Sequence, residues 1–236
     1  IILAPGALAL ALSLTTPYSA SADVILLPST GTDSMGNALP AGSLDPHYMV
    51  SGPGTSGVFQ SAAVLSSLWS AWVPDSTTSA WIGWKDDSDT SPHGNYDYRL
   101  TFNLTGYDPS TVSLTGRWAA DQYGSIDLNG SSTGVSVPDG NWNEANDPNL
   151  TSFTISSGFV SGTNTLDFIV NEPDGYDGLR VQDLQMSATP SAVPEPSSLT
   201  LFGMALTGMG FFARRRRPTP KSQDQRPNTQ VLCTGH

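Results

Sequence analysis

Two short runs of the sequence gather enough carboxylates to bind a cation. Asp86, Asp87 and Asp89 form the first run, and Asp174 and Asp177 lie in the second. Calcium takes about six to eight oxygen ligands from carboxylates and backbone carbonyls, often in loops. Neither run fits an EF-hand loop, because the required glycine and terminal glutamate are missing. The runs suggest a structural calcium ion and no other cofactor; the alternative is a solvated acidic surface.

Three aromatic side chains in polar surroundings are candidates for binding sugars. Trp142 lies in the polar segment Asn141–Asn149, and Tyr123 and Tyr176 each lie near aspartates, in segments that we expect to be loops. The apolar faces of pyranose rings stack on exposed aromatic rings. We therefore expect these three residues to bind polysaccharide; the alternative is that they anchor their loops to the rim of the domain.

Catalytic constellations are not recognisable in the sequence. The two histidines of the central region, His47 and His93, lack a metal-ligand spacing, and there is no Gly-x-Ser-x-Gly elbow. Of the 21 acidic residues, all but Glu195 and Asp224 lie between residues 23 and 190, which leaves 19 there. So many carboxylates cannot identify a glycosidase pair. We expect a protein that is not an enzyme and keep a secreted glycan hydrolase or lyase as the alternative.

Charge excludes another class of function. The formal net charge of the 236 residues is −11, and residues 23–190 hold only four of the ten basic side chains, so that segment carries 4 − 19 = −15. A nucleic-acid-binding protein needs a basic face, so we expect no nucleic-acid partner. The low charged fraction of 13%, with 23 glycines and 18 prolines, also argues against a helical bundle.

The central region alternates apolar and polar residues, as half-buried strands do. The clearest case is Tyr96–Leu104, in which every second residue is apolar. Asn129-Gly130 is a strong signal for a tight turn, and Ser161–Asn164 is predicted to join two strands of a hairpin, Phe159–Val160 and Leu166–Val170. Further short strands are expected at Val58–Val64, Trp81–Trp84, Val112–Trp118, Ile126–Leu128, Phe153–Ile155 and Leu179–Met186. This spacing predicts an all-β sandwich or jelly roll over residues 23–190.

Both ends have the pattern of processing segments. Residues 1–22 begin with an apolar run and end in Ala20-Ser21-Ala22, which predicts a signal peptide with a truncated start. Near the other end, Pro194-Glu195-Pro196 precedes the apolar run Leu199–Ala213. An arginine cluster follows, Arg214, Arg215, Arg216 and Arg217. The apolar run predicts a short transmembrane helix, held on the cytoplasmic side by the arginines.

This C-terminal arrangement resembles the PEP-CTERM sorting signal of exported bacterial proteins. The resemblance covers Val193 to about Arg217, within a predicted sorting segment of residues 191–217. It implies recognition by an exosortase, after transient anchoring in the inner membrane and on the way to the cell surface or extracellular matrix. The same segment is also catalogued as the C-terminal domain of ice-binding proteins, so an ice-binding surface is a second alternative. Residues 218–236 extend beyond the usual end of the signal and are expected to be a disordered tail.

The central region resembles a galactose-binding-like jelly roll. The resemblance spans roughly residues 45–188 and rests on a series of short motifs in a fixed order, among them Asp45-Pro46-His47-Tyr48, Trp118-Ala119-Ala120-Asp121 and Gly178-Leu179-Arg180-Val181. It implies a β-sandwich that often holds a structural calcium ion. Together, these observations predict an exported, non-enzymatic β-sandwich that binds polysaccharide.

Overall fold

The computed structural model describes residues 21–87, 89–143, 150–191 and 203–204. The chain divides into two units, residues 1–192 and 193–236, and the fold described below belongs to the first. The predicted tail, nearly all of the signal peptide and nearly all of the sorting segment lie outside the described residues. Within the described residues, no helix has the length and apolarity that crossing a membrane requires.

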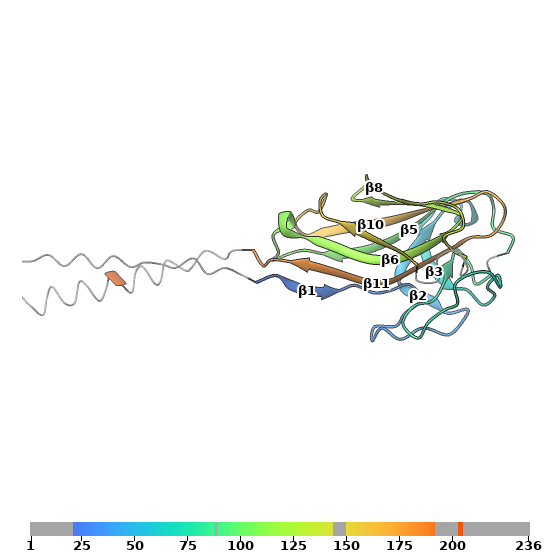
Figure 1. The fold of residues 1–236 in the computed structure, drawn as a ribbon, viewed down its shortest axis with the longest axis horizontal. Coiled ribbons are helices and arrows are strands. Elements are labelled where there is room, and N and C mark those ends of the chain that lie inside the picture. The colour runs from blue at the N-terminus through green and yellow to red at the C-terminus, as the bar shows by residue number, and fades with distance from the viewer. Residues whose placement is uncertain (1–20, 88, 144–149, 192–202, 205–236) are drawn as a thin grey trace, which may run out of the picture. The chain divides into compact units, whose positions relative to one another are not determined.

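The described part of the chain is all-β, with one hydrogen-bonded path of antiparallel strands (Figure 1). The strands are β1 Asp23–Leu26, β2 Leu44–Ser51, β3 Gln60–Val64, β4 Ile82–Gly83, β5 Gly94–Asn103, β6 Ser113–Asp121, β7 Tyr123–Leu128, β8 Ser131–Val137, β9 Thr151–Ile155, β10 Thr163–Glu172 and β11 Gly178–Ala188. Two 3-10 turns, η1 Pro53–Thr55 and η2 Pro109–Thr111, lie between strands. The order is β8-β7-β10-β5-β2-β3-β4-β11-β6-β9, and β1 pairs with β11.

Aromatic rings fill the space where this sheet curls onto itself like a sandwich. Trp118 of β6 is fully buried and lies 5.5 Å, between ring centroids, from Phe168 of β10. Phe153 of β9 packs edge-on against both rings. Because β6 and β10 are not hydrogen-bonded neighbours, the contact of Trp118 with Phe168 joins two layers across the core.

The predicted alternation is confirmed in β5. Tyr96, Tyr98, Leu100 and Phe102 point into the core, and the residues between them lie at least partly in solvent. The Asn129-Gly130 turn between β7 and β8 is also confirmed. Both residues have positive φ, 53° and 74°, as a type I′ turn requires.

The predicted hairpin around Ser161–Asn164 is wrong. Phe159 and Val160 lie in a loop, and β10 pairs with β5 and β7 instead. The buried Asn164 side chain accepts a hydrogen bond from Val160 N–H at 2.9 Å and donates to Val160 O and Gly162 O. This amide satisfies the backbone groups that a partner strand would have satisfied, so the turn closes without a second strand.

Gly124 on β7 tests how tightly the layers pack. A Cβ atom there would lie 2.7 Å from the Trp118 ring and 3.0 Å from Ala120 Cβ. We expect Gly124→Ala to lower the free energy of unfolding by about 1–3 kcal/mol, because the core has no room for the added methyl group. Urea denaturation measures this change. The control is Ser125→Ala on the opposite face of the strand, expected to stay within about 0.5 kcal/mol of the parent; equal effects of the two variants would contradict the packing described here.

Candidate functional site

Three aromatic side chains from separate loops meet at one end of the sandwich. Trp69 stacks on Tyr176, with ring centroids 5.9 Å apart and an interplanar angle of 19°. The ring centroids of Trp142 and Trp69 lie 5.1 Å apart, and the interplanar angle is 40°. Trp69 is 47% exposed, whereas Trp142 and Tyr176 are half-buried. We call these three residues the aromatic cluster; it presents one ring to solvent on two supporting rings.

A small second core holds the aromatic cluster in place. Its buried members are Leu65, Trp72, Val73, Trp81, Ala119 and Leu150, and both Trp142 and Tyr176 pack against it. Trp142 is fixed further by its Nε1–H, which donates to Asp139 Oδ1 at 3.1 Å. Its carbonyl accepts from Val73 N–H at 2.9 Å. The supporting rings are therefore preorganised by packing and by hydrogen bonds.

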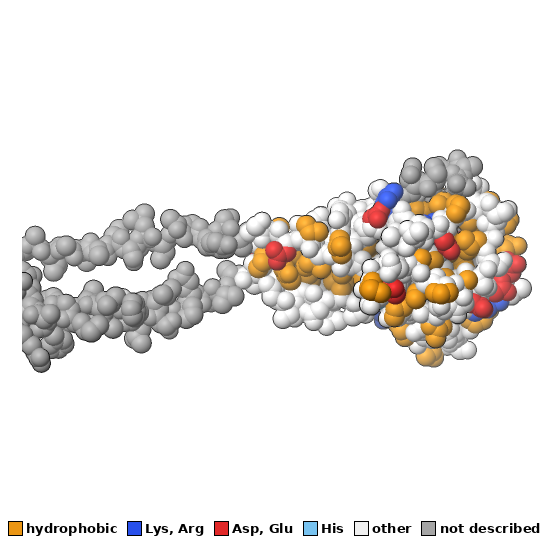
Figure 2. Space-filling model, turned by 90° about the horizontal axis from the view of Figure 1, so that it is seen from below, with side chains coloured by type: hydrophobic (Ala, Val, Ile, Leu, Met, Phe, Trp, Pro, Cys, Tyr) orange, Lys and Arg blue, Asp and Glu red, His pale blue; other side chains and the backbone are white. Residues whose placement is uncertain are grey.

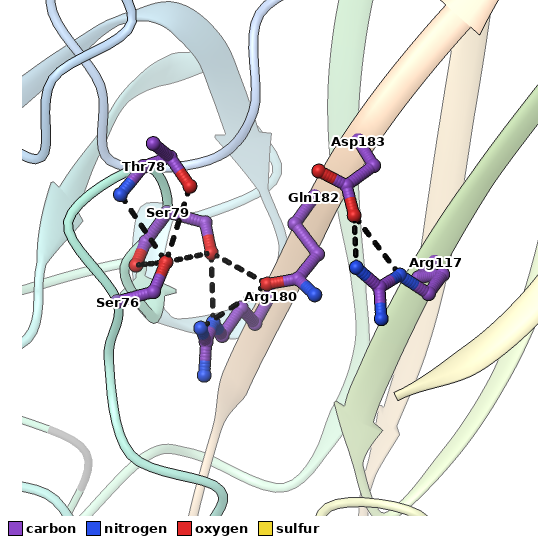
Figure 3. Close-up of polar contacts among 7 residues, drawn as sticks. All are labelled: Ser76, Thr78, Ser79, Arg117, Arg180, Gln182 and Asp183. Carbon is purple, nitrogen blue, oxygen red and sulfur yellow. Dashed lines mark hydrogen bonds and ion pairs between the residues drawn. The ribbon is translucent and has the colours of Figure 1, made fainter. Parts of the chain in front are cut away.

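Arg180 anchors the loop between β3 and β4, which carries Trp69. The side chain is 2% exposed, and its guanidinium donates to Ser79 Oγ and Gln182 Oε1 (Figure 3). It also donates to the carbonyls of Val73 and Pro74. A buried guanidinium needs such acceptors, because an unpaired charge in the interior is costly. The arginine of the sequence Gly-Leu-Arg-Val therefore organises the loop next to the aromatic cluster.

An open cleft of about 590 Å³ adjoins Tyr176. One wall is residues 89–93 and the other is Asp174, Gly175 and Tyr176. The hydrogen bond from Ser91 N–H to Gly175 O, 2.9 Å long, joins the walls. The Trp84 Nε1–H donates to Ser91 Oγ at 3.1 Å and holds the first wall in position. The cleft thus combines an aromatic edge with carboxylate, hydroxyl and imidazole groups.

Three buried carboxylates lie behind this end of the domain. Asp177 is fully buried and accepts a 2.5 Å hydrogen bond from the Tyr98 hydroxyl. Burial raises the pKa of Asp177 to about 7, although this hydrogen bond partly opposes the rise. Burial, followed by the negative charge of Asp174, raises the pKa of Asp121 to about 8. Burial also raises the pKa of Glu172, whose Oε1 accepts from the N–H groups of Asp174 and Gly175.

The acidic runs predicted to bind calcium have other partners in the structure. Asp87 pairs with Lys85 at 3.5 Å and accepts from Asp89 N–H, and Asp177 turns inward to Tyr98. No group of three or more His, Cys, Asp or Glu among the described residues is placed to hold a metal ion. As the structure places them, these side chains do not form a calcium site. Calcium binding stays a prediction from the sequence, and thermal melts in calcium and in chelator would check it.

The structure brings together two of the three predicted sugar-binding residues. Trp142 and Tyr176 share the aromatic cluster, whereas Tyr123 makes no ring contact with it among the contacts of the described residues. Tyr123 is 51% exposed and begins strand β7, so the expectation that it lies in a loop is wrong. Sequence reasoning missed Trp69. Its polar neighbours in Ser66-Ser67-Leu68-Trp69-Ser70 are the same signal that identified Trp142.

Comparison with family models identifies the C-terminal segment. Residues 192–217 match the PEP-CTERM protein-sorting motif. The chain carries a PEP-CTERM sorting motif. This confirms the prediction made from Pro194, Glu195, Pro196 and the arginine cluster, although these residues lie outside the part that the structure describes. The motif implies processing by an exosortase, and PEP-CTERM proteins are exported and sorted to the cell surface.

Comparison with solved structures finds matches at low identity and low TM-score. A family 35 carbohydrate-binding module from Clostridium thermocellum has 14% identity and a TM-score of 0.32, covering 52% of this chain and 85% of the module. The module from Paenibacillus barcinonensis has 17% identity and a TM-score of 0.29, covering 51% and 88%. An apo cyclase from Fischerella sp. has 12% identity and a TM-score of 0.41, covering 74% and 100%. Comparison with curated proteins gave no match.

The buried acids predict an unusual dependence of stability on pH. Asp121, Asp177 and Glu172 have raised pKa values, so the folded domain keeps protons that the unfolded chain releases above about pH 4. The free energy of unfolding should therefore fall as the pH rises from about 4 to 8. When both are measured in the presence of a chelator, we expect the melting temperature at pH 8.5 to lie at least about 3 °C below that at pH 5.5. Asp97, with a pKa of about 6, contributes in the same direction.

Two variants test whether the buried carboxyls cause this dependence of stability on pH. Asp121→Asn should flatten the pH dependence of the melting temperature, because the amide does not titrate. Asp108→Asn should leave it unchanged over the same range, since hydrogen bonds from Ser110 lower the pKa of Asp108. A melting temperature that rises with pH across this range would show that the buried carboxyls do not control stability.

Proposed function

We propose that residues 23–190 form a carbohydrate-binding domain that the sorting motif delivers to the cell surface. The observation that carries this proposal is the aromatic cluster, in which Trp69 is exposed on the ring of Tyr176. Large aromatic rings gathered at one exposed place mark a binding site more often than a plain surface. The apolar face of a sugar ring stacks on such a ring.

Polar groups around the cluster suit the hydroxyls of a sugar. Asp174 and His93 line the adjoining cleft, and Asp139 lies at the edge of Trp142. Binding sites for small molecules commonly combine apolar walls with a few convergent polar groups that set orientation. A glycan chain that stacks on Trp69 would reach these groups through the hydroxyls of neighbouring sugars.

We propose further that binding occurs without hydrolysis. A glycosidase places two carboxyl groups on either side of the scissile bond, and one of them carries a raised pKa. The carboxyls with the most strongly raised pKa values here, Asp121 and Asp177, are 2% and 0% exposed, as is Glu172 at 0%. Carboxyls at this depth do not reach a glycosidic oxygen in a surface cleft, which favours a binding domain over the hydrolase alternative.

The finer features expected from the sequence belong to this proposal. They are a galactose-binding-like jelly-roll topology, a signal peptide at residues 1–22 and a short membrane helix at residues 199–213. The protein would be anchored transiently in the inner membrane and would act at the cell surface or in the extracellular matrix.

Removing rings from the aromatic cluster tests the proposal. A glycan array of the purified 23–190 segment first identifies a ligand, and affinity electrophoresis then measures binding. We expect Trp69→Ala and Tyr176→Ala each to weaken binding about tenfold or more, because each removes a stacked ring. Tyr123→Ala, which removes an exposed ring without a contact to the cluster, should bind like the parent. An array without any bound glycan, or equal losses in all three variants, would refute the proposal.

Processing of the exported protein is a separate prediction. The PEP-CTERM motif at residues 192–217 implies cleavage by an exosortase. The mature surface protein should therefore lack Arg214–Arg217, and removal of the proposed signal peptide should leave it beginning near Asp23. Intact mass of protein released from the cell surface measures both ends. Mature protein that still carries the arginines would show that the motif is not processed.

A further inference from the structure

Carboxylates outnumber basic groups in the cleft beside the aromatic cluster. His93 also lines it, but among the described residues no ion pair joins His93 to a carboxylate of the cleft. The carboxylates of Asp89 and Asp174 lie on opposite walls, and both residues are exposed. Among the described residues, the Asp174 carboxylate accepts hydrogen bonds from the side-chain amide of Gln122, at Oδ2, and from the N–H of Tyr176 at 3.4 Å. Both donors are neutral. Figure 2 shows acidic side chains at the right-hand end, with basic atoms beside them; this is the loop end of the sandwich in Figure 1.

The Lys and Arg side chains of the domain have partners other than the Asp174 carboxylate. The segment 23–190 has four Lys and Arg residues, and all four belong to the described part. Arg99 pairs with Asp97 and Asp167, and Arg117 pairs with Asp183. Arg180 holds the carbonyls of its loop. Lys85 borders the cleft, but its ammonium pairs with Asp87 and donates to Thr90.

The buried acids behind the cleft add further unsatisfied acceptors. Glu172 uses Oε1 for the N–H groups of Asp174 and Gly175 on the cleft wall, and its Oε2 has no hydrogen-bond partner among the described residues. The same holds for Asp121 Oδ2 and Asp177 Oδ1. Each of these three side chains is at least 98% buried. Buried acceptors without partners are costly, but none of these three residues lines the cleft, so a ligand there would meet the exposed Asp174 and Asp89 instead.

We propose that the cleft selects glycans whose sugars carry free amino groups. The inference rests on the proposed function, and it names the ligand class of that site. A glycan stacked on the exposed Trp69 ring would extend past Tyr176 into the cleft. An ammonium group on its next sugar would meet the Asp174 carboxylate, which forms no ion pair among the described residues. A uronic acid at the same position brings like charges together and is disfavoured.

Three hexamers of matched length test this selection by isothermal titration calorimetry. They are the hexamers of glucosamine, of N-acetylglucosamine and of galacturonic acid, at a pH low enough to protonate the sugar amines. We expect the glucosamine hexamer to bind at least about fivefold tighter than the N-acetylated one, and the galacturonic acid hexamer to bind weakest. Raising the salt concentration should reduce the preference, because exposed charges are screened.

Matched charge variants assign the preference to the cleft. Asp174→Asn should reduce the ratio between the glucosamine and N-acetylglucosamine affinities, since it removes the charge from the cleft wall. Asp108→Asn removes the same charge near η2, at the other end of β5, and should leave the ratio unchanged. An equal loss in both variants would show that net charge alone attracts the amino sugar, which overturns the proposal.

The outcomes also separate this inference from the function on which it rests. Equal binding of the glucosamine and N-acetylglucosamine hexamers, lost in Trp69→Ala, overturns the selection for amines and leaves carbohydrate binding intact. The same holds if the array identifies only neutral or acidic glycans. Failure of every glycan on the array to bind overturns both proposals.

Discussion

The hydrogen bond between the Tyr98 hydroxyl and the Asp177 carboxylate holds the loop end of the domain together. Tyr98 belongs to β5 and Asp177 directly precedes β11, so the bond joins two strands that are far apart in the sheet order. A buried carboxylate without donors is costly, and the Tyr98 hydroxyl supplies a donor to Asp177 Oδ2. The next residue, Gly178, lets Trp72 approach so closely that a Cβ atom would lie 2.7 Å from its ring. The position of Tyr176, and with it the stacked pair, depends on these two adjacent residues.

Local patterns predicted most of the strands, because alternation and turn chemistry are properties of neighbouring residues. Tyr96–Leu104 and Asn129-Gly130 behave as their sequence indicates. The error at Phe159–Val160 has a tertiary cause. Asn164 supplies hydrogen bonds that the alternation rule assigns to a partner strand, and nothing in the local sequence shows that its side chain turns back onto the loop.

The candidate site was only partly predictable, for a related reason. Polar surroundings correctly marked Trp142 and Tyr176 as rings outside the main core, and the same rule would have marked Trp69. The rule cannot tell which loops meet, since that depends on the second core and on Arg180. It also cannot distinguish a solvated aspartate from a buried one. Asp174 and Asp177 lie three residues apart in one loop, yet one faces water and the other faces Tyr98.

The course of β11 has a mechanical consequence. The strand starts beside Tyr176 and ends at Ala188, which pairs with Asp23 of β1, so both termini of the domain leave from the end opposite the aromatic cluster. A pull between a ligand bound at the aromatic cluster and the termini of the domain would run along β11. The hydrogen bonds of its antiparallel ladder with β6 are perpendicular to the strands. Such a pull loads them together in shear, rather than opening them one at a time, so the domain is built to bear tension along its length.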